Sequence, residues 1–86
     1  MYDFSQPSPN LILSTSGNAL RILGRAGLQF ETPGGNLDID SEMLSPAISI
    51  VIYKYSISNE LVRDPDATLA EVRSALVWAG FTVEVI

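Results

Sequence analysis

The spacing of apolar residues predicts strands over most of the chain. A short apolar run at 11–15 stops at turn-forming residues, and the segments 28–32, 37–44 and 81–86 alternate apolar with polar residues, as half-buried strands do. In 37–44 the acidic residues occupy alternate positions, so a strand would place them on one face, with Leu37 and Ile39 on the other. The chain is therefore expected to form a sheet that has one apolar face.

Residues 47–58 form the densest run of β-branched and aromatic residues. As a strand, this run has apolar residues on both faces: Ile48, Ile50 and Ile52 on one, and Val51, Tyr53, Tyr55 and Ile57 on the other. The pattern predicts either a central strand covered on both sides or a strand with a bulge that re-aims its second half. A single strand of this length would run about 35–40 Å, so part of it is expected to project or to bend.

Two segments, 23–31 and 76–84, share the pattern Leu-x-x-Ala-Gly followed by alternating residues. The pattern is typical of a helix that ends at a glycine and continues as a strand. In the second copy, Thr68 and Glu71 have the spacing of a capping box, Asp66 lies near the positive end of the helix dipole, and Gly80 follows the apolar stripe. That stripe consists of Leu69, Val72, Leu76 and Ala79. A helix ending at Gly80 is therefore predicted.

The first copy is ambiguous at residues 19–26. Apolar residues at 19, 22, 23 and 26 share one helical face, with Arg21 and Arg25 on another. However, Gly24 would cost a helix interior about 1 kcal/mol relative to alanine. The segment 16–18 could instead be the tight turn of a hairpin that pairs 11–15 with 20–23. Periodicity favours the helix.

With a helix at 19–26, the element order predicts an α+β fold, a ferredoxin-like β-α-β-β-α-β sandwich with two helices on one face of an antiparallel sheet. With a strand there, the alternative is a β-meander followed by one helix and a C-terminal strand. Residues 1–9, with Pro7 and Pro9 among polar residues, are expected to be an N-terminal arm, and 10–86 a single α+β domain.

Composition restricts the chemistry. Ten acidic residues against five Lys and Arg give a net charge of −5, which disfavours nucleic acid and favours a basic protein surface as partner. The chain has no cysteine and no histidine, which removes thiolate sites and the commonest general base and metal ligand. No serine lies in a nucleophile elbow. We therefore expect no enzyme, no catalytic residue, no bound metal and no cofactor.

Size and hydropathy suggest where the protein acts. A chain of this length buries only about 60–65% of its unfolded surface, so a homodimer or another homo-oligomer is expected to add stability. No apolar run approaches the roughly 20 residues of a membrane span, and the N-terminal segment has no secretory signal pattern. The expected location is cytoplasmic, without a membrane partner.

Two groups of residues are candidates for contact with a protein partner. Asp38, Asp40 and Glu42 form an acidic strand face that lacks the glycine and spacing of a calcium loop, so it is interpreted as a solvated face or as a dock for a basic surface. Tyr53 and Tyr55 add aromatic side chains on the neighbouring strand-like run.

Trp78 is a further candidate. It lies beside the buried helix stripe, at the edge of the core or as an exposed aromatic anchor. Together these patterns predict a small acidic non-enzymatic protein-interaction domain, which self-associates through the long strand or the Trp78 helix and binds a protein partner. The alternative is a small-molecule-binding module with an apolar pocket between sheet and helices, opened by Tyr53, Tyr55 or Phe30.

Overall fold

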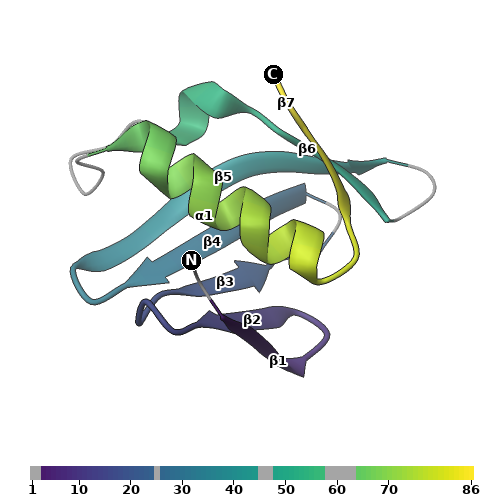
Figure 1. The fold of residues 1–86 in the computed structure, drawn as a ribbon. Coiled ribbons are helices and arrows are strands. Elements are labelled where there is room, and N and C mark those ends of the chain that lie inside the picture. Colours follow the sequence, from purple (N-terminus) through teal and green to yellow (C-terminus); the bar gives the residue numbers. More distant parts are fainter. Residues whose placement is uncertain (1–2, 25, 45–47, 58–63) are drawn as a thin grey trace.

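A computed structural model describes residues 3–24, 26–44, 48–57 and 64–86 (Figure 1). These residues form one sheet in the order β1-β2-β3-β4-β5-β6-β7. The strands are β1 (Phe4–Ser8), β2 (Leu11–Ser14), β3 (Ala19–Ile22), β4 (Ala26–Thr32), β5 (Gly35–Leu44), β6 (Ser49–Ile52) and β7 (Thr82–Val85). A 3₁₀ turn, η1 (Lys54–Ile57), and the helix α1 (Pro65–Trp78) lie between β6 and β7.

The sheet is an antiparallel meander with one parallel pair at its end. Strands β1 to β6 pair antiparallel in sequence order. Among the described strands, β7 alone pairs parallel, with β6, because α1 carries the chain back along the sheet before β7 begins. The sheet curls, and α1 lies across its concave face (Figure 1). Within the predicted N-terminal arm, Phe4–Ser8 forms the edge strand β1.

The ferredoxin-like fold with two helices is therefore wrong. Ala19–Ile22 is strand β3, which pairs with β2 as a hairpin. Leu20 and Ile22 are buried and Arg21 between them is exposed, which is the period of a strand. Gly24 has a φ of 115°, a left-handed conformation that ends the segment rather than continuing a helix. The element order is that of the alternative, a meander followed by one helix and a strand. Arg25 lies outside the described residues.

Residues 47–58 do not form one long strand, and the predicted bend within this run is confirmed. Strand β6 covers only Ser49–Ile52, and the chain then bends into η1. The bend explains the two apolar faces of the run, because Ile57 in η1 turns back to the core and is 1% exposed. Residues 47 and 58 lie outside the described ranges.

Helix α1 begins earlier than its predicted cap. Asp64 is the N-cap, and its Oδ1 accepts a hydrogen bond of 3.1 Å from the Ala67 N–H. Thr68 therefore lies inside the helix, and the predicted capping box with Glu71 is wrong. The helix does end as predicted, since Gly80 adopts a φ of 100° just beyond it.

The core lies between the concave face of the sheet and the inner side of α1. Alternate residues of the inner strands meet three helix residues there, and Ile57 closes one end. The buried cluster is Ile12, Leu20, Ile22, Leu28, Phe30, Leu37, Ile39, Ile50, Ile52, Ile57, Val72, Ala75 and Leu76. The opposite, convex face of the sheet carries the alternate residues, which are mostly polar, and we call it the outer face.

Glu71 is a buried carboxylate that joins α1 to the β2–β3 turn. Its side chain is on the inner part of the helix, and the residue is 5% exposed. The Ser16 hydroxyl donates to the carboxylate, and the Asn18 side-chain amide lies 3.0 and 3.2 Å from its two oxygens. Because a buried charge is costly without hydrogen bonds, these donors hold the turn against the helix.

Removing this carboxylate is expected to destabilise the fold. Glu71→Gln and Glu71→Ala should each lower the free energy of unfolding by about 1–3 kcal/mol, because the Asn18 and Ser16 donors lose a charged acceptor. Urea unfolding measures the change. Glu84→Gln, which removes one carboxylate from the exposed outer face, is the matched control and should change stability by less than about 0.5 kcal/mol. Equal effects at the two positions would contradict the role of Glu71.

Candidate functional site on the outer face of the sheet

All the predicted site residues except Trp78 lie together beside β5. Along this strand Asp38, Asp40 and Glu42 are exposed on the outer face, while the residues between them are buried. Tyr53 follows β6, and Tyr55 lies in η1, so the bend after β6 brings both aromatic side chains over the same strand. We call this group of Asp38, Asp40, Glu42, Tyr53 and Tyr55 the tyrosine–carboxylate face.

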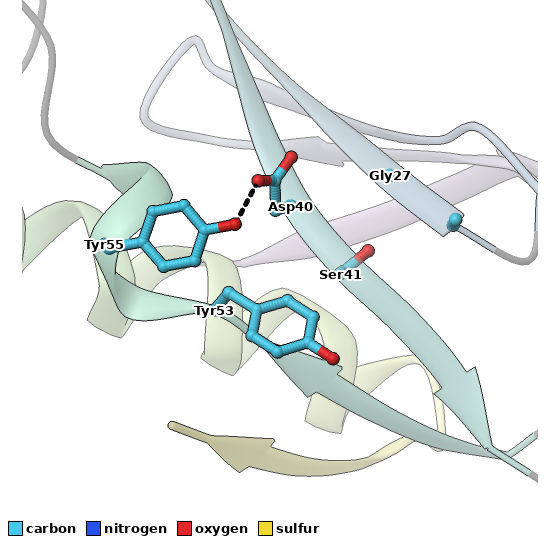
Figure 2. A pocket seen from close by; sticks show the side chains of 6 residues that line it. Gly27, Asp40, Ser41, Tyr53 and Tyr55 are labelled. Carbon is cyan, nitrogen blue, oxygen red and sulfur yellow. Dashed lines mark hydrogen bonds between the residues drawn. The ribbon is translucent and has the colours of Figure 1, made fainter.

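The two tyrosines are hydrogen-bonded to carboxylates of β5. The Tyr55 hydroxyl donates to Asp40 Oδ2 at 2.6 Å (Figure 2), and the Tyr53 hydroxyl donates to Glu42 Oε2 at 3.0 Å. The two rings have centroids 6.2 Å apart with a 45° angle between their planes. Each aromatic ring is therefore held beside a negative charge, although Tyr55 is 71% exposed.

Ser56 fixes the bend that places these rings. Its hydroxyl donates to the Tyr53 carbonyl at 2.6 Å and accepts a hydrogen bond of 2.9 Å from the Asp40 N–H. The Tyr53 N–H donates to the Asp40 carbonyl at 3.0 Å. The Ser56 hydroxyl thus accepts the Asp40 N–H bond that strand pairing would give to the Tyr53 carbonyl, so pairing with β5 stops there and η1 stays against β5. No sequence pattern singles out Ser56.

An open depression of about 440 Å³ adjoins the tyrosines (Figure 2). Asp40, Ser41, Tyr53 and Tyr55 line it together with Ala26 and Gly27 of β4. The β4–β5 register shifts between Ala26 and Leu28, and Gly27 at this irregularity has a φ of 91°. Gly27 is the glycine of the first Leu-x-x-Ala-Gly copy, where the sequence pattern predicted a helix end. In the structure it lies within β4 and lines the depression.

The neighbouring carboxylates raise the pKa of both tyrosines. For Tyr53 the hydrogen bond to Glu42 is the largest cause, followed by the charge of Glu42. For Tyr55 the hydrogen bond to Asp40 is again the largest cause, followed by partial burial and by the charge of Asp40. Both phenols therefore stay protonated above their ordinary pKa of 10.0 and remain hydrogen-bond donors near neutral pH.

The negative charge of the outer face extends beyond this site. Val51 of β6 pairs with Glu42 of β5 on one side and with Glu84 of β7 on the other. Within the described ranges the ion pairs are Arg21–Glu31 at 2.8 Å and Lys54–Asp66 at 3.9 Å. Neither involves the carboxylates of β5 or Glu84, so these charges are open to an external cation.

Trp78 lies apart from the tyrosine–carboxylate face. It is at the C-terminal end of α1, 49% exposed, and its ring centroid is 5.8 Å from that of Phe4 with an angle of 46°. Phe4 belongs to β1, so this contact joins the helix to the edge of the sheet. Sequence analysis missed this partner, because it treated residues 1–9 as an arm.

Among the described residues, those proposed to open an apolar pocket lie on different sides of the sheet. Phe30 is 5% exposed and packed in the core, whereas Tyr53 and Tyr55 line the depression on the outer face. In the part of the chain that the structure describes, no three acidic, histidine or cysteine side chains are grouped so as to hold a metal ion. None of the helices formed by these residues is long and apolar enough to span a membrane.

Comparison with known proteins gives no relative from which a function could be transferred: no family model, no curated protein and no solved structure matches the chain. The geometry of the site therefore has to carry the functional argument.

The hydrogen bonds of the tyrosines predict a specific alkaline titration. Asp40→Asn should lower the pKa of Tyr55, and Glu42→Gln that of Tyr53, because each substitution removes the carboxylate that favours the neutral phenol. Proton-detected NMR of the tyrosine rings, or ultraviolet absorbance of tyrosinate, follows the titration. Asp38→Asn is the matched control and should leave both titrations unchanged, because the Asp38 carboxylate accepts its hydrogen bond, of 3.4 Å, from the Gln29 side-chain amide.

The raised pKa values of Tyr53 and Tyr55 also determine how the stability of the fold changes with pH. A phenol with a raised pKa in the folded state contributes stability in full below pH 10, and loses it as the pH rises through the raised value, because the unfolded chain ionises first. Wild-type protein should therefore lose stability above pH 10 more steeply than the Asp40→Asn variant. Identical titrations in the three variants and the wild type would show that these hydrogen bonds are absent.

Proposed function

We propose that this chain is a small, non-enzymatic protein-interaction domain that binds a basic protein surface through the tyrosine–carboxylate face. The observation that carries the proposal is the pair of tyrosine rings held by hydrogen bonds to Asp40 and Glu42, beside an open depression. The net charge of −5 would speed the encounter with a positively charged partner.

Arginine is the partner side chain that this geometry suits best. Its guanidinium donates two parallel hydrogen bonds to a carboxylate and stacks on an aromatic ring, and both kinds of contact are on offer within the face. Tyrosine rings also bury a large area with few rotatable bonds, and these two are already oriented by their carboxylates. Binding would therefore cost little additional side-chain entropy.

The chemistry of the face supports binding rather than catalysis. Each tyrosine has its pKa raised, so neither is suited to act as a base near neutral pH. The chain has no histidine or cysteine to complete a reactive set. The carboxylates of β5 are exposed, which leaves them as charges for a partner to meet.

A short arginine-rich peptide tests the proposal. In NMR titration of the 15N-labelled chain, shifts should concentrate at Tyr53, Tyr55 and their β5 neighbours and decline with added salt. The double substitution Asp40→Asn/Glu42→Gln should weaken binding about tenfold, because it removes both charge-assisted acceptors. Tyr55→Ala should also weaken binding, since it removes an aromatic surface.

The matched control is Asp3→Lys, which changes the net charge by the same two units at an exposed position before β1. It should change the affinity by less than about twofold. Equal losses for the control and the double variant would mean that net charge alone attracts the peptide, and the proposed face would then be wrong.

Self-association is a separate part of the proposal and now depends on the end of α1. The long strand that motivated it is only Ser49–Ile52, but Val77 and Trp78 are 54% and 49% exposed next to each other. Light scattering over a concentration series should show a mass that rises with concentration and a smaller rise for Val77→Lys. A constant monomer mass would remove this part of the proposal.

A further inference from the structure

Strand β7 offers a free edge for another strand. It pairs with β6 on one side, and among the described residues no strand pairs with its other side. The Thr82 N–H donates to the Ile48 carbonyl, just before β6, at 2.7 Å, and the Ile86 N–H donates to the Ile52 carbonyl at 3.0 Å. In a parallel pair the residues that bond to one neighbour alternate with those that face away. The N–H and C=O groups of Val83 and Val85 therefore point away from β6.

The two edges of the sheet differ in how they are protected. The β1 edge contains Pro7 and a register shift between Ser5 and Ser8, and both features hinder the addition of another strand. The β7 edge has the residues Thr82, Val83, Glu84 and Val85, without proline or a register shift. Its β-branched residues favour the extended conformation that pairing requires.

The charge of Glu84 selects what can pair there. If two copies of this chain joined their β7 edges antiparallel, the register that uses both Val83 and Val85 of each would place Glu84 opposite Glu84 of the other copy. Like charges opposite each other destabilise a strand pair. Glu42 lies in the same cross-strand row, separated from Glu84 only by Val51, and adds to the repulsion. A second copy is therefore disfavoured in that register.

We propose that a partner protein adds an extended basic segment to the β7 edge as the next strand of the sheet, with a lysine or arginine opposite Glu84. The inference rests on the proposed function and deepens it by naming the conformation of the basic partner and the place where its backbone binds. The Val83 and Val85 side chains pack against the core, so the alternate residues of the added segment, which lie beside them, would be apolar.

The added strand would be continuous with the tyrosine–carboxylate face. Glu84 and Glu42 occupy one row on the outer face, and Tyr53 is hydrogen-bonded to Glu42 at 3.0 Å. A long basic side chain opposite Glu84 would point to the same outer face. Backbone pairing would then supply affinity, and the row of carboxylates would supply preference for a basic segment.

The experiment uses the full 86-residue chain and a capped nine-residue peptide in which valine alternates with lysine or threonine, with lysine at the centre. NMR should show large shifts at Val83 and Val85 and at least about tenfold slower exchange of their amides when the peptide is bound. A peptide of the same sequence, N-methylated at the alternate residues that would pair, keeps the charge. Its methyl groups replace the N–H donors to the Val83 and Val85 carbonyls and block the close approach of the two strands, so it should not protect these amides.

Substitutions at Glu84 test the choice of partner. Glu84→Lys should weaken binding of the lysine peptide about fivefold or more, because an opposite-charge pair becomes a like-charge pair. The same substitution should strengthen binding of a peptide with glutamate at its centre, because there a like-charge pair becomes an opposite-charge pair. Asp3→Lys, a charge reversal at an exposed position before β1, is the matched control and should alter both affinities equally little. Far-ultraviolet circular dichroism verifies that each variant is folded.

The outcomes separate this inference from the proposed function. If the N-methylated peptide binds as well as the parent and shifts Tyr53 and Tyr55 only, the face binds basic groups and strand addition is wrong. If a higher protein concentration slows amide exchange at Val83 and Val85 without any peptide, a second copy occupies the edge and the inference is overturned. If the glutamate peptide pairs as strongly as the lysine peptide, the preference for a basic segment is wrong.

Discussion

In the part of the chain that the structure describes, one α-helix has to cover the apolar face of seven strands, and the rest of the fold follows from that mismatch. A flat sheet of this width would leave its outer strands without cover, whereas a curled sheet wraps its concave face around α1 (Figure 1). Val72 and Leu76 are 0% exposed, which shows that the inner side of the helix is fully covered by the sheet. The hydrogen bonds from Ser16 and Asn18 to Glu71 fix α1 against the β2–β3 turn.

The same constraint leaves the outer face and the β7 edge without cover from α1. Polar alternate residues make this face compatible with water, and on β5 they are carboxylates. The Ser56 hydrogen bonds then bend the chain so that Tyr53 and Tyr55 stand over those carboxylates. An acidic, aromatic surface beside an unpaired strand edge has the properties of a docking surface. It is left exposed because α1 covers only the concave face of the sheet.

Sequence patterns predicted those features that depend on neighbouring residues. The alternation at 37–44 and the glycine stop at Gly80 were confirmed because local periodicity and capping decide them. The strand β3 was predicted only as the alternative to a helix, because Ile22 fits both a helical and a strand period and the pairing of Leu20 with Phe30 is non-local. Glu71 has capping-box spacing from Thr68, yet donors more than fifty positions away determine its contacts.

For the candidate site, the acidic residues and the tyrosines were found from sequence, but their contacts were not. Those contacts need the bend after β6, and the bend depends on Ser56 reaching Asp40 across the sheet. Trp78 was selected from its position on the helix, while its contact with Phe4 depends on β1 being part of the sheet. In each case a contact between residues far apart in the sequence decides between structures that the local sequence pattern allows equally well.

Amide hydrogen exchange along β7 in the free chain at low concentration tests most directly whether the sheet ends in an open edge. The account predicts alternation: slow exchange at Thr82, Glu84 and Ile86, whose N–H groups face β6, and fast exchange at Val83 and Val85. Uniformly slow exchange at all five amides would contradict it, because the edge would then already be paired. Uniformly fast exchange would equally contradict it, because β7 would not belong to the sheet.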